Sequence, residues 1–128
     1  MGANADVVRA AWQAFGEQDL DRAAADIEES AEIALPESLP WGGTHRGPDG
    51  FKHVVGEFMS HLEDFRPRPR GFFEAEGDRV VVPVDITART KAGKELTGPV
   101  LWLYELRDGK IVRAELFADT ADTLEAIR

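Results

Sequence analysis

The end of the chain holds the strongest constraint on the fold: two long apolar runs that flank Arg107-Asp108-Gly109-Lys110. Asp-Gly between runs of β-branched, aromatic and aliphatic residues is one of the strongest short-range signals for a β-hairpin. If Asp108 and Gly109 form a two-residue loop, Arg107 pairs with Lys110, and every later cross-strand pair follows from that register. The sequence therefore predicts two long antiparallel strands, one on each side of this turn.

The predicted register assigns each side chain to one face of the hairpin, because side chains alternate along a strand. One face would mix aromatic, aliphatic and charged residues: Val100, Trp102, Tyr104, Leu106, Ile111, Arg113, Glu115, Phe117 and Asp119. The other face would be aliphatic, with Leu101, Leu103, Val112, Ala114, Leu116 and Ala118. The mixed character of the first face is the main indication of function.

Two interpretations fit this mixed face. A face that met only solvent would not need Trp102 and Phe117, and a dry core would not tolerate Glu115, because a buried charge is costly unless paired. Aromatic walls with a few polar groups are typical of a ligand cavity. The alternative is a half-covered sheet whose charges lie at its wet rim. The residues alone leave both interpretations open.

Length and composition limit the classes of protein. The 128 residues are enough for a single domain, residues 1–128, with one core. Acidic residues outnumber basic ones 24 to 15, and this net charge of -9 argues against nucleic acid and gives no reason to bind an anionic membrane. With no cysteine, no signal peptide and no run of eighteen apolar residues, we expect a cytoplasmic protein without disulfides.

Three helices are expected before the long strands. The first runs from Ala5 to Gln18, with Asn4 as its cap and apolar residues at helical spacing on one face. Asp19 would cap a short second helix. Pro48 suits the first turn of the third, whose apolar stripe comprises Phe51, Val54, Val55, Phe58, Met59 and Leu62.

Alternating patterns predict further strands over residues 31–35, 65–75, 80–90 and 96–106. Pro67 and Pro69 cannot donate to a ladder, so the second of these favours a sheet edge. The segment Pro36 to Gly47 is predicted to be a loop. If Lys91 pairs with Lys94, the aliphatic face gains Val80, Val82, Val84 and Ile86 beside Leu101 and Leu103. Residues 120–127 are predicted to form a short final helix.

This order of elements indicates an α+β fold. A single sheet with two substantially apolar faces needs a cover on each side, and the helices supply one of them. The second cover is most simply another subunit, so we expect a homodimer.

Three segments resemble the nuclear-transport-factor-2-like superfamily: Trp12 to Leu20, Trp41 to Phe51 and Arg107 to Asp119. The chain is similar to SnoaL-like and ketosteroid-isomerase-like members over nearly its whole length. The resemblance implies a cone-shaped fold in which three N-terminal helices pack on a curved, mostly antiparallel sheet. It implies no single reaction, because this superfamily includes isomerases, cyclases, hydratases and domains with no known reaction.

The resemblance also carries over single positions. Phe117 falls where the isomerases have a cavity aromatic, and Arg113 and Glu115 take cavity-side positions. The chain departs from ketosteroid isomerases at Leu35-Pro36, where they keep a carboxylate base. It departs again on the first helix, where Trp12 and Phe15 stand. The oxyanion-hole tyrosine of the ketosteroid isomerases has no obvious match there.

The candidate catalytic residues are Asp119, His45 and Tyr104. Desolvation in an aromatic pocket would raise the pKa of Asp119 toward neutrality, although Asp119 could cap the final helix instead, or could do both. Histidine is the usual side chain for moving a proton near neutral pH, so His45 could do so, or it is simply a polar loop residue. Tyr104 could donate a hydrogen bond to a substrate oxygen, or it packs with its hydroxyl satisfied locally.

The expected ligand-binding residues are Trp12, Phe15, Trp41, Phe58, Trp102, Glu115 and Phe117. No cofactor and no metal are expected, because His53, Glu57 and His61 lie opposite the apolar stripe of their helix without a further ligand. We expect an apolar cavity for a small hydrophobic, oxygen-bearing molecule, polyketide-like or steroid-like. Whether the protein is an enzyme stays open: it would be a cofactor-free acid–base isomerase, cyclase or hydratase, or a non-catalytic ligand-binding or dimerisation domain.

Overall fold

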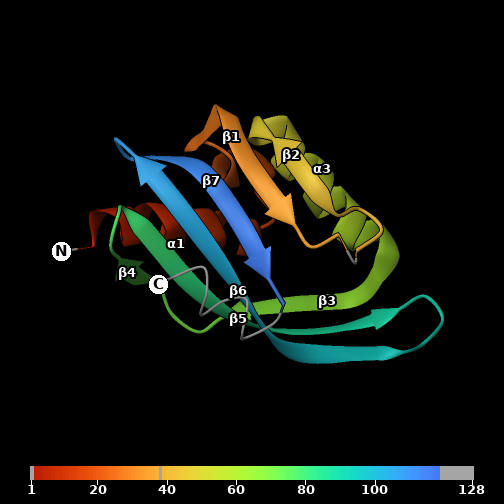
Figure 1. The fold of residues 1–128 in the computed structure, drawn as a ribbon. Helices are drawn as coiled ribbons and strands as arrows, with labels where there is room; N and C mark the ends of the chain where they lie inside the picture. Colours follow the sequence, from red (N-terminus) through yellow and green to blue (C-terminus); the bar gives the residue numbers. More distant parts are fainter. Residues whose placement is uncertain (1, 38, 119–128) are drawn as a thin grey trace.

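The computed structural model describes residues 2–37 and 39–118, and its fold is α+β, as predicted (Figure 1). The elements in chain order are α1 (Ala3–Gly16), α2 (Leu20–Ala23), β1 (Ile27–Leu35), β2 (Gly43–Arg46), α3 (Gly47–His61), β3 (Leu62–Pro69), β4 (Phe73–Ala75), β5 (Arg79–Thr90), β6 (Glu95–Arg107) and β7 (Lys110–Phe117). In the described ranges, neither α1 nor α3 has an apolar stretch long enough to cross a bilayer.

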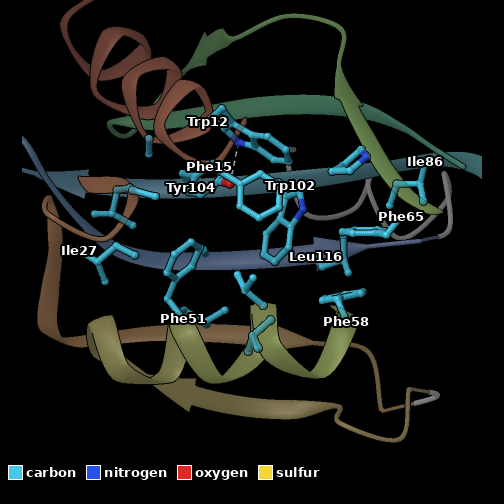
Figure 2. Close-up of a pocket in the computed structure, with 18 residues that line it drawn as sticks. Trp12, Phe15, Ile27, Phe51, Phe58, Phe65, Ile86, Trp102, Tyr104 and Leu116 are labelled. Carbon is cyan, nitrogen blue, oxygen red and sulfur yellow. Dashed lines mark hydrogen bonds between the residues drawn. The ribbon is translucent and has the colours of Figure 1, made fainter. Parts of the chain in front are cut away.

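The strands form one curved sheet in the order β2-β1-β7-β6-β5-β3, and β4 also pairs with β5. The described pairs are antiparallel except that of β1 with β7, which is parallel. The helices α1 and α3 lie on the same side of this sheet (Figures 1 and 2). We call the side that faces them the inner face and the opposite side the outer face.

The helix starts agree with the predictions for α2 and α3. The Asp19 side chain accepts a hydrogen bond from the Arg22 amide at 3.1 Å, which caps α2. Pro48 lies in the first turn of α3. Gly47, just before it, has φ 68°, and a Cβ there would lie 2.6 Å from the Glu29 carbonyl oxygen. Glycine is therefore required where α3 passes close to β1.

The predicted cap of α1 is wrong. The helix begins at Ala3, so Asn4 lies inside it. The side-chain amide of Asn4 instead donates a hydrogen bond to the Asp78 carboxylate at 3.4 Å. A carboxylate oxygen of Glu74, from β4, accepts a hydrogen bond from the Ala5 amide at 3.2 Å. A negative charge from a distant strand thus satisfies the positive end of the helix.

The part of the chain from β2 to β4 differs from the prediction in three places. Residues 43–46 of the expected loop form β2, which pairs with β1. The helix α3 ends at His61, so Leu62 begins β3 instead of extending the apolar stripe, and Met59 is 54% exposed. The predicted strand over residues 65–75 is divided into β3 and β4. The strand with two prolines, β3, lies at a sheet edge, as predicted.

The Asp108-Gly109 hairpin begins in the predicted register and then departs from it. Arg107 pairs with Lys110, but a β-bulge follows the next pair, so that Glu105 lies opposite Arg113. Beyond the bulge, every residue of β7 lies on the face opposite to the predicted one. The straight register would have turned two charged side chains inward beside Trp102 and Tyr104, and the bulge avoids that cost.

The β5–β6 hairpin is also shifted by one residue. Arg89 pairs with Glu95, and the loop holds three residues, Lys91 to Gly93, with Gly93 at φ 90°. A three-residue loop with glycine in the left-handed region is a common hairpin connection. The shift moves the apolar residues of β5 to the face of Trp102 and Tyr104, so the predicted aliphatic face with Leu101 and Leu103 is wrong.

The core lies on the inner face. Val80, Val82 and Val84 of β5 are at most 1% exposed and form one buried cluster with Val8, Leu106 and Ile111. A second buried cluster beneath α3 comprises Ile33, Leu35, Trp41, Val54, Ala114 and Leu116. Val100, Trp102 and Tyr104 of β6 pack against both clusters. The space that the two clusters leave between them is the candidate site.

Candidate ligand cavity

A cavity of about 100 Å³ lies between the inner face of the sheet and the helices α1 and α3 (Figure 2). Its volume is several times the roughly 10–15 Å³ that one water molecule requires. Seven of its lining residues are aromatic: Trp12, Phe15, Phe51, Phe58, Phe65, Trp102 and Tyr104. The others are alanine, valine, isoleucine, leucine or proline. No charged side chain lines the cavity in the described part of the chain.

The side chains of this lining contain only three polar atoms: the indole nitrogens of Trp12 and Trp102 and the hydroxyl oxygen of Tyr104. The Trp12 indole donates a hydrogen bond to the Tyr104 hydroxyl at 3.1 Å, from α1 to β6 (Figure 2). This hydrogen bond connects α1 to β6 in the wall of the cavity.

The hydroxyl of Tyr104 stays protonated. Burial raises the pKa of Tyr104 well above its ordinary value of 10, and the hydrogen bond from Trp12 offsets only part of that effect. The Tyr104 hydroxyl can therefore donate a hydrogen bond near neutral pH and cannot serve as a base. None of the described residues accepts its proton.

The second donor is the indole N–H of Trp102. This side chain stacks against Tyr104 with ring centroids 6.0 Å apart and planes 24° apart. It makes no hydrogen bond with any described residue. The cavity therefore offers two unengaged donors on a carbon surface, and the described lining contributes neither a carboxylate nor an imidazole.

Five of the predicted site residues come together around this cavity: Trp12, Phe15, Phe58, Trp102 and Tyr104. Trp12 and Phe15 pack edge to face, with centroids 5.9 Å apart, because they are three residues apart on α1. Phe58 approaches from α3 and stacks on Phe65 of β3 at 5.3 Å. Their roles in binding stay predictions.

Glu115 and Phe117 do not lie on the cavity side, so their predicted placement is wrong. The bulge in β7 sets them opposite Leu103 and Leu101 on the outer face. Arg113 also lies there and forms ion pairs with Glu115 at 3.1 Å and with Glu32 at 2.8 Å. Water and opposite charge both stabilise these groups on the outer face.

Trp41 and His45 lie outside the cavity lining. Trp41 is 8% exposed and packs between Phe58 and His61, so it supports the cavity wall from behind. His45 lies in β2 opposite Ile33, with its Nε2 atom 2.9 Å from the Trp41 carbonyl oxygen. Asp119 lies outside the described residues.

Most of the other lining residues were not predicted as site residues, among them Ile27, Ile33, Phe65, Pro67, Ile86, Ala114 and Leu116. Phe65 and Pro67 had a usable signal, because they alternate with Arg66 and Arg68 in the edge strand. The β7 residues had none, since their face depends on the bulge.

On α3, Glu57 lies 3.6 Å from His53 and 3.4 Å from His61. No group among the described residues could hold a metal ion.

Solved structures with this fold span nearly the whole chain. An NTF2-like protein of unknown function from Burkholderia pseudomallei is 25% identical, with 99% of this chain and 98% of that chain covered and a TM-score of 0.82. TerC, co-crystallised with polyporic acid, is 29% identical, with 98% of each chain covered and a TM-score of 0.81. An NTF2-like protein from Burkholderia thailandensis is 22% identical, with 98% of this chain and 97% of that chain covered and a TM-score of 0.84.

Comparison of the sequence with curated proteins finds no significant match. The model of the SnoaL-like domain family matches residues 8–114, which is most of the chain. The chain therefore belongs to the SnoaL-like family.

Proposed function

We propose that this protein binds a small, neutral and largely apolar molecule, polyketide-like or steroid-like, through a hydrogen bond from Tyr104 to an oxygen of the ligand. The observation that carries this proposal is the composition of the cavity lining, whose side chains are carbon apart from three polar atoms, and these leave two donors unengaged. TerC, a related protein, was co-crystallised with polyporic acid, which supports a small-molecule ligand here too.

The lining also defines the chemistry of the ligand. Apolar surface that leaves water for this cavity gains about 25 cal/mol per Å². A charged ligand would lose its hydration without meeting an opposite charge among the described lining residues, so a neutral ligand is favoured. An oxygen acceptor would satisfy the buried Tyr104 hydroxyl, whose proton has no acceptor among the described residues.

Filling the cavity tests this proposal. We expect 1-tetralone, a neutral bicyclic ketone, to bind the protein with measurable heat in isothermal titration calorimetry. Ala114→Leu adds a larger side chain to the inner face of β7 and should weaken this binding at least about tenfold. The matched control, Ala34→Leu, makes the same change on the outer side of β1 and should leave affinity unchanged.

The proposal is contradicted if 1-tetralone does not bind at millimolar concentration. It is also contradicted if both leucine variants bind the ketone as the unmodified protein does. Urea unfolding of the two variants checks that each retains its fold, because overpacking a core costs about 1–3 kcal/mol.

Acid–base catalysis is a second candidate function, and the protonation of Tyr104 favours it. A buried O–H that stays protonated can stabilise negative charge on a carbonyl oxygen. A base would have to take a proton from the carbon beside that carbonyl. The described lining has no such base, and His45 does not line the cavity. Asp119, two residues beyond the end of β7, is the candidate from the sequence.

Exchange of the protons beside the carbonyl of 1-tetralone for deuterium tests this second function. A catalytic Asp119 would take a proton from carbon, Tyr104 would stabilise the enolate, and a deuteron from D₂O would return to the same carbon. Asp119→Asn should then slow the exchange by about 10²–10⁴-fold with little change in affinity. Exchange no faster than in buffer would rule out catalysis of this proton transfer and leave the binding function.

We further propose that the protein forms a homodimer through the outer face of the sheet. Val81, Pro83, Leu101 and Phe117 give this face partly exposed apolar surface. Apolar surface of this kind on a sheet is stabilised by a second copy of the chain.

Sedimentation at micromolar concentration tests the dimer. We expect twice the chain mass of 14.1 kDa. Leu101→Glu should shift the protein to a monomer, because it places a charge in the proposed interface. Met59→Glu, at an exposed position on α3, is the control and should remain dimeric. A monomeric unmodified protein would refute the proposal.

A further inference from the structure

We propose that Trp12 determines ligand specificity by positioning the Tyr104 proton, so that the cavity selects a carbonyl oxygen over a hydroxyl group. This inference rests on the proposed binding function and names the chemical class of ligand that the same cavity prefers. Trp12 acts through Tyr104 and is therefore a positioning residue.

The direction of the Trp12–Tyr104 hydrogen bond is fixed by chemistry. An indole nitrogen carries a proton and has no lone pair to accept one, whereas a phenol oxygen can both donate and accept. Across the 3.1 Å contact, Trp12 must donate and Tyr104 must accept. The accepting side of the Tyr104 oxygen is thus occupied before any ligand enters.

The Tyr104 proton then has to point elsewhere. No acceptor for it lies among the described residues, and the only other polar side-chain atom of the lining, the Trp102 indole nitrogen, is itself a donor. Figure 2 shows the Tyr104 oxygen between Trp12 and the space enclosed by the lining. Among the side chains of the described lining, a ligand therefore meets donors only.

Donors alone discriminate between a ketone and the alcohol of the same shape. A ketone oxygen accepts the Tyr104 hydrogen bond and has no proton of its own to satisfy. The alcohol can accept the same bond, but it then buries an O–H group with no acceptor. An unsatisfied buried donor costs enough free energy to weaken binding about tenfold or more.

Loss of the Trp12 N–H would remove this discrimination. The Tyr104 hydroxyl could then rotate, donating to a ketone or accepting from an alcohol. The expected consequence is a change in the ratio of two affinities. A general loosening of the cavity would instead weaken both ligands together.

The test compares 1-tetralone with 1-tetralol by calorimetry in the unmodified protein and in Trp12→Phe. The unmodified protein should bind the ketone about tenfold or more tightly than the alcohol. In Trp12→Phe this ratio should approach one. Phe15→Leu, which changes the shape of the same wall without removing a hydrogen bond, should keep the ratio even if both affinities fall.

Two further measurements guard against a purely steric effect. Site-specific replacement of Trp12 by 3-benzothienylalanine keeps the bicyclic shape without the N–H group and should lower the ratio as Trp12→Phe does. The infrared carbonyl stretch of bound 1-tetralone should lie at lower wavenumber than in hydrocarbon solvent, and Tyr104→Phe should remove that shift.

The outcomes separate this inference from the binding function. If 1-tetralone binds and Ala114→Leu weakens it, but Trp12→Phe keeps the original ratio, the role of Trp12 is wrong and the binding function stands. An unmodified protein that prefers the alcohol would also overturn the inference. Failure of 1-tetralone to bind at all would overturn the binding function itself.

Discussion

The cost of burying charge governs how this sheet is assembled. Its inner face must accept the two long helices and therefore has to be apolar. In β7 the charged residues Arg113 and Glu115 alternate with Ala114 and Leu116, so only one register keeps the charges in contact with water. A bulge leaves one residue unpaired, but that is cheaper than two desolvated charges. The same register turns two small or aliphatic side chains toward the helices, and these become part of the cavity wall.

The cavity follows from the size and polarity of the side chains around it. Two buried clusters, mostly of aliphatic residues, fill the space at either side, while the aromatic rings of α1, α3 and β6 pack against them. The Trp12 N–H donates to the Tyr104 hydroxyl across this space, which leaves the Tyr104 proton and the Trp102 N–H without a partner among the described residues. The polarity of the site is therefore set by these two donors.

The sequence predicts much of this architecture and misses the register of two hairpins and several element boundaries. Helical and alternating periodicity predict the fold class, the long helices and the edge strand with Pro67 and Pro69, because local patterns determine those features. They also bring five of the aromatic residues to the cavity. The predicted faces of β5 and β7 are wrong. A bulge beyond the Leu106–Ile111 pair reverses the later side chains of β7, and a third residue in the loop that contains Gly93 reverses the side chains of β5 relative to β6. Neither the bulge nor the loop length has a reliable signature in a single sequence. The burial of apolar side chains across the whole sheet decides both.

A crystal structure of the protein with 1-tetralone tests the central claim most directly, namely that the carbon-lined cavity receives its ligand at Tyr104. We expect the ketone between α1, α3 and the inner face, with its oxygen about 2.5–3.0 Å from the Tyr104 hydroxyl. Ala114 and Leu116 should contact the ligand rings, while Arg113 should remain on the outer face. A ketone bound elsewhere, or one whose oxygen is directed away from Tyr104, would contradict the account.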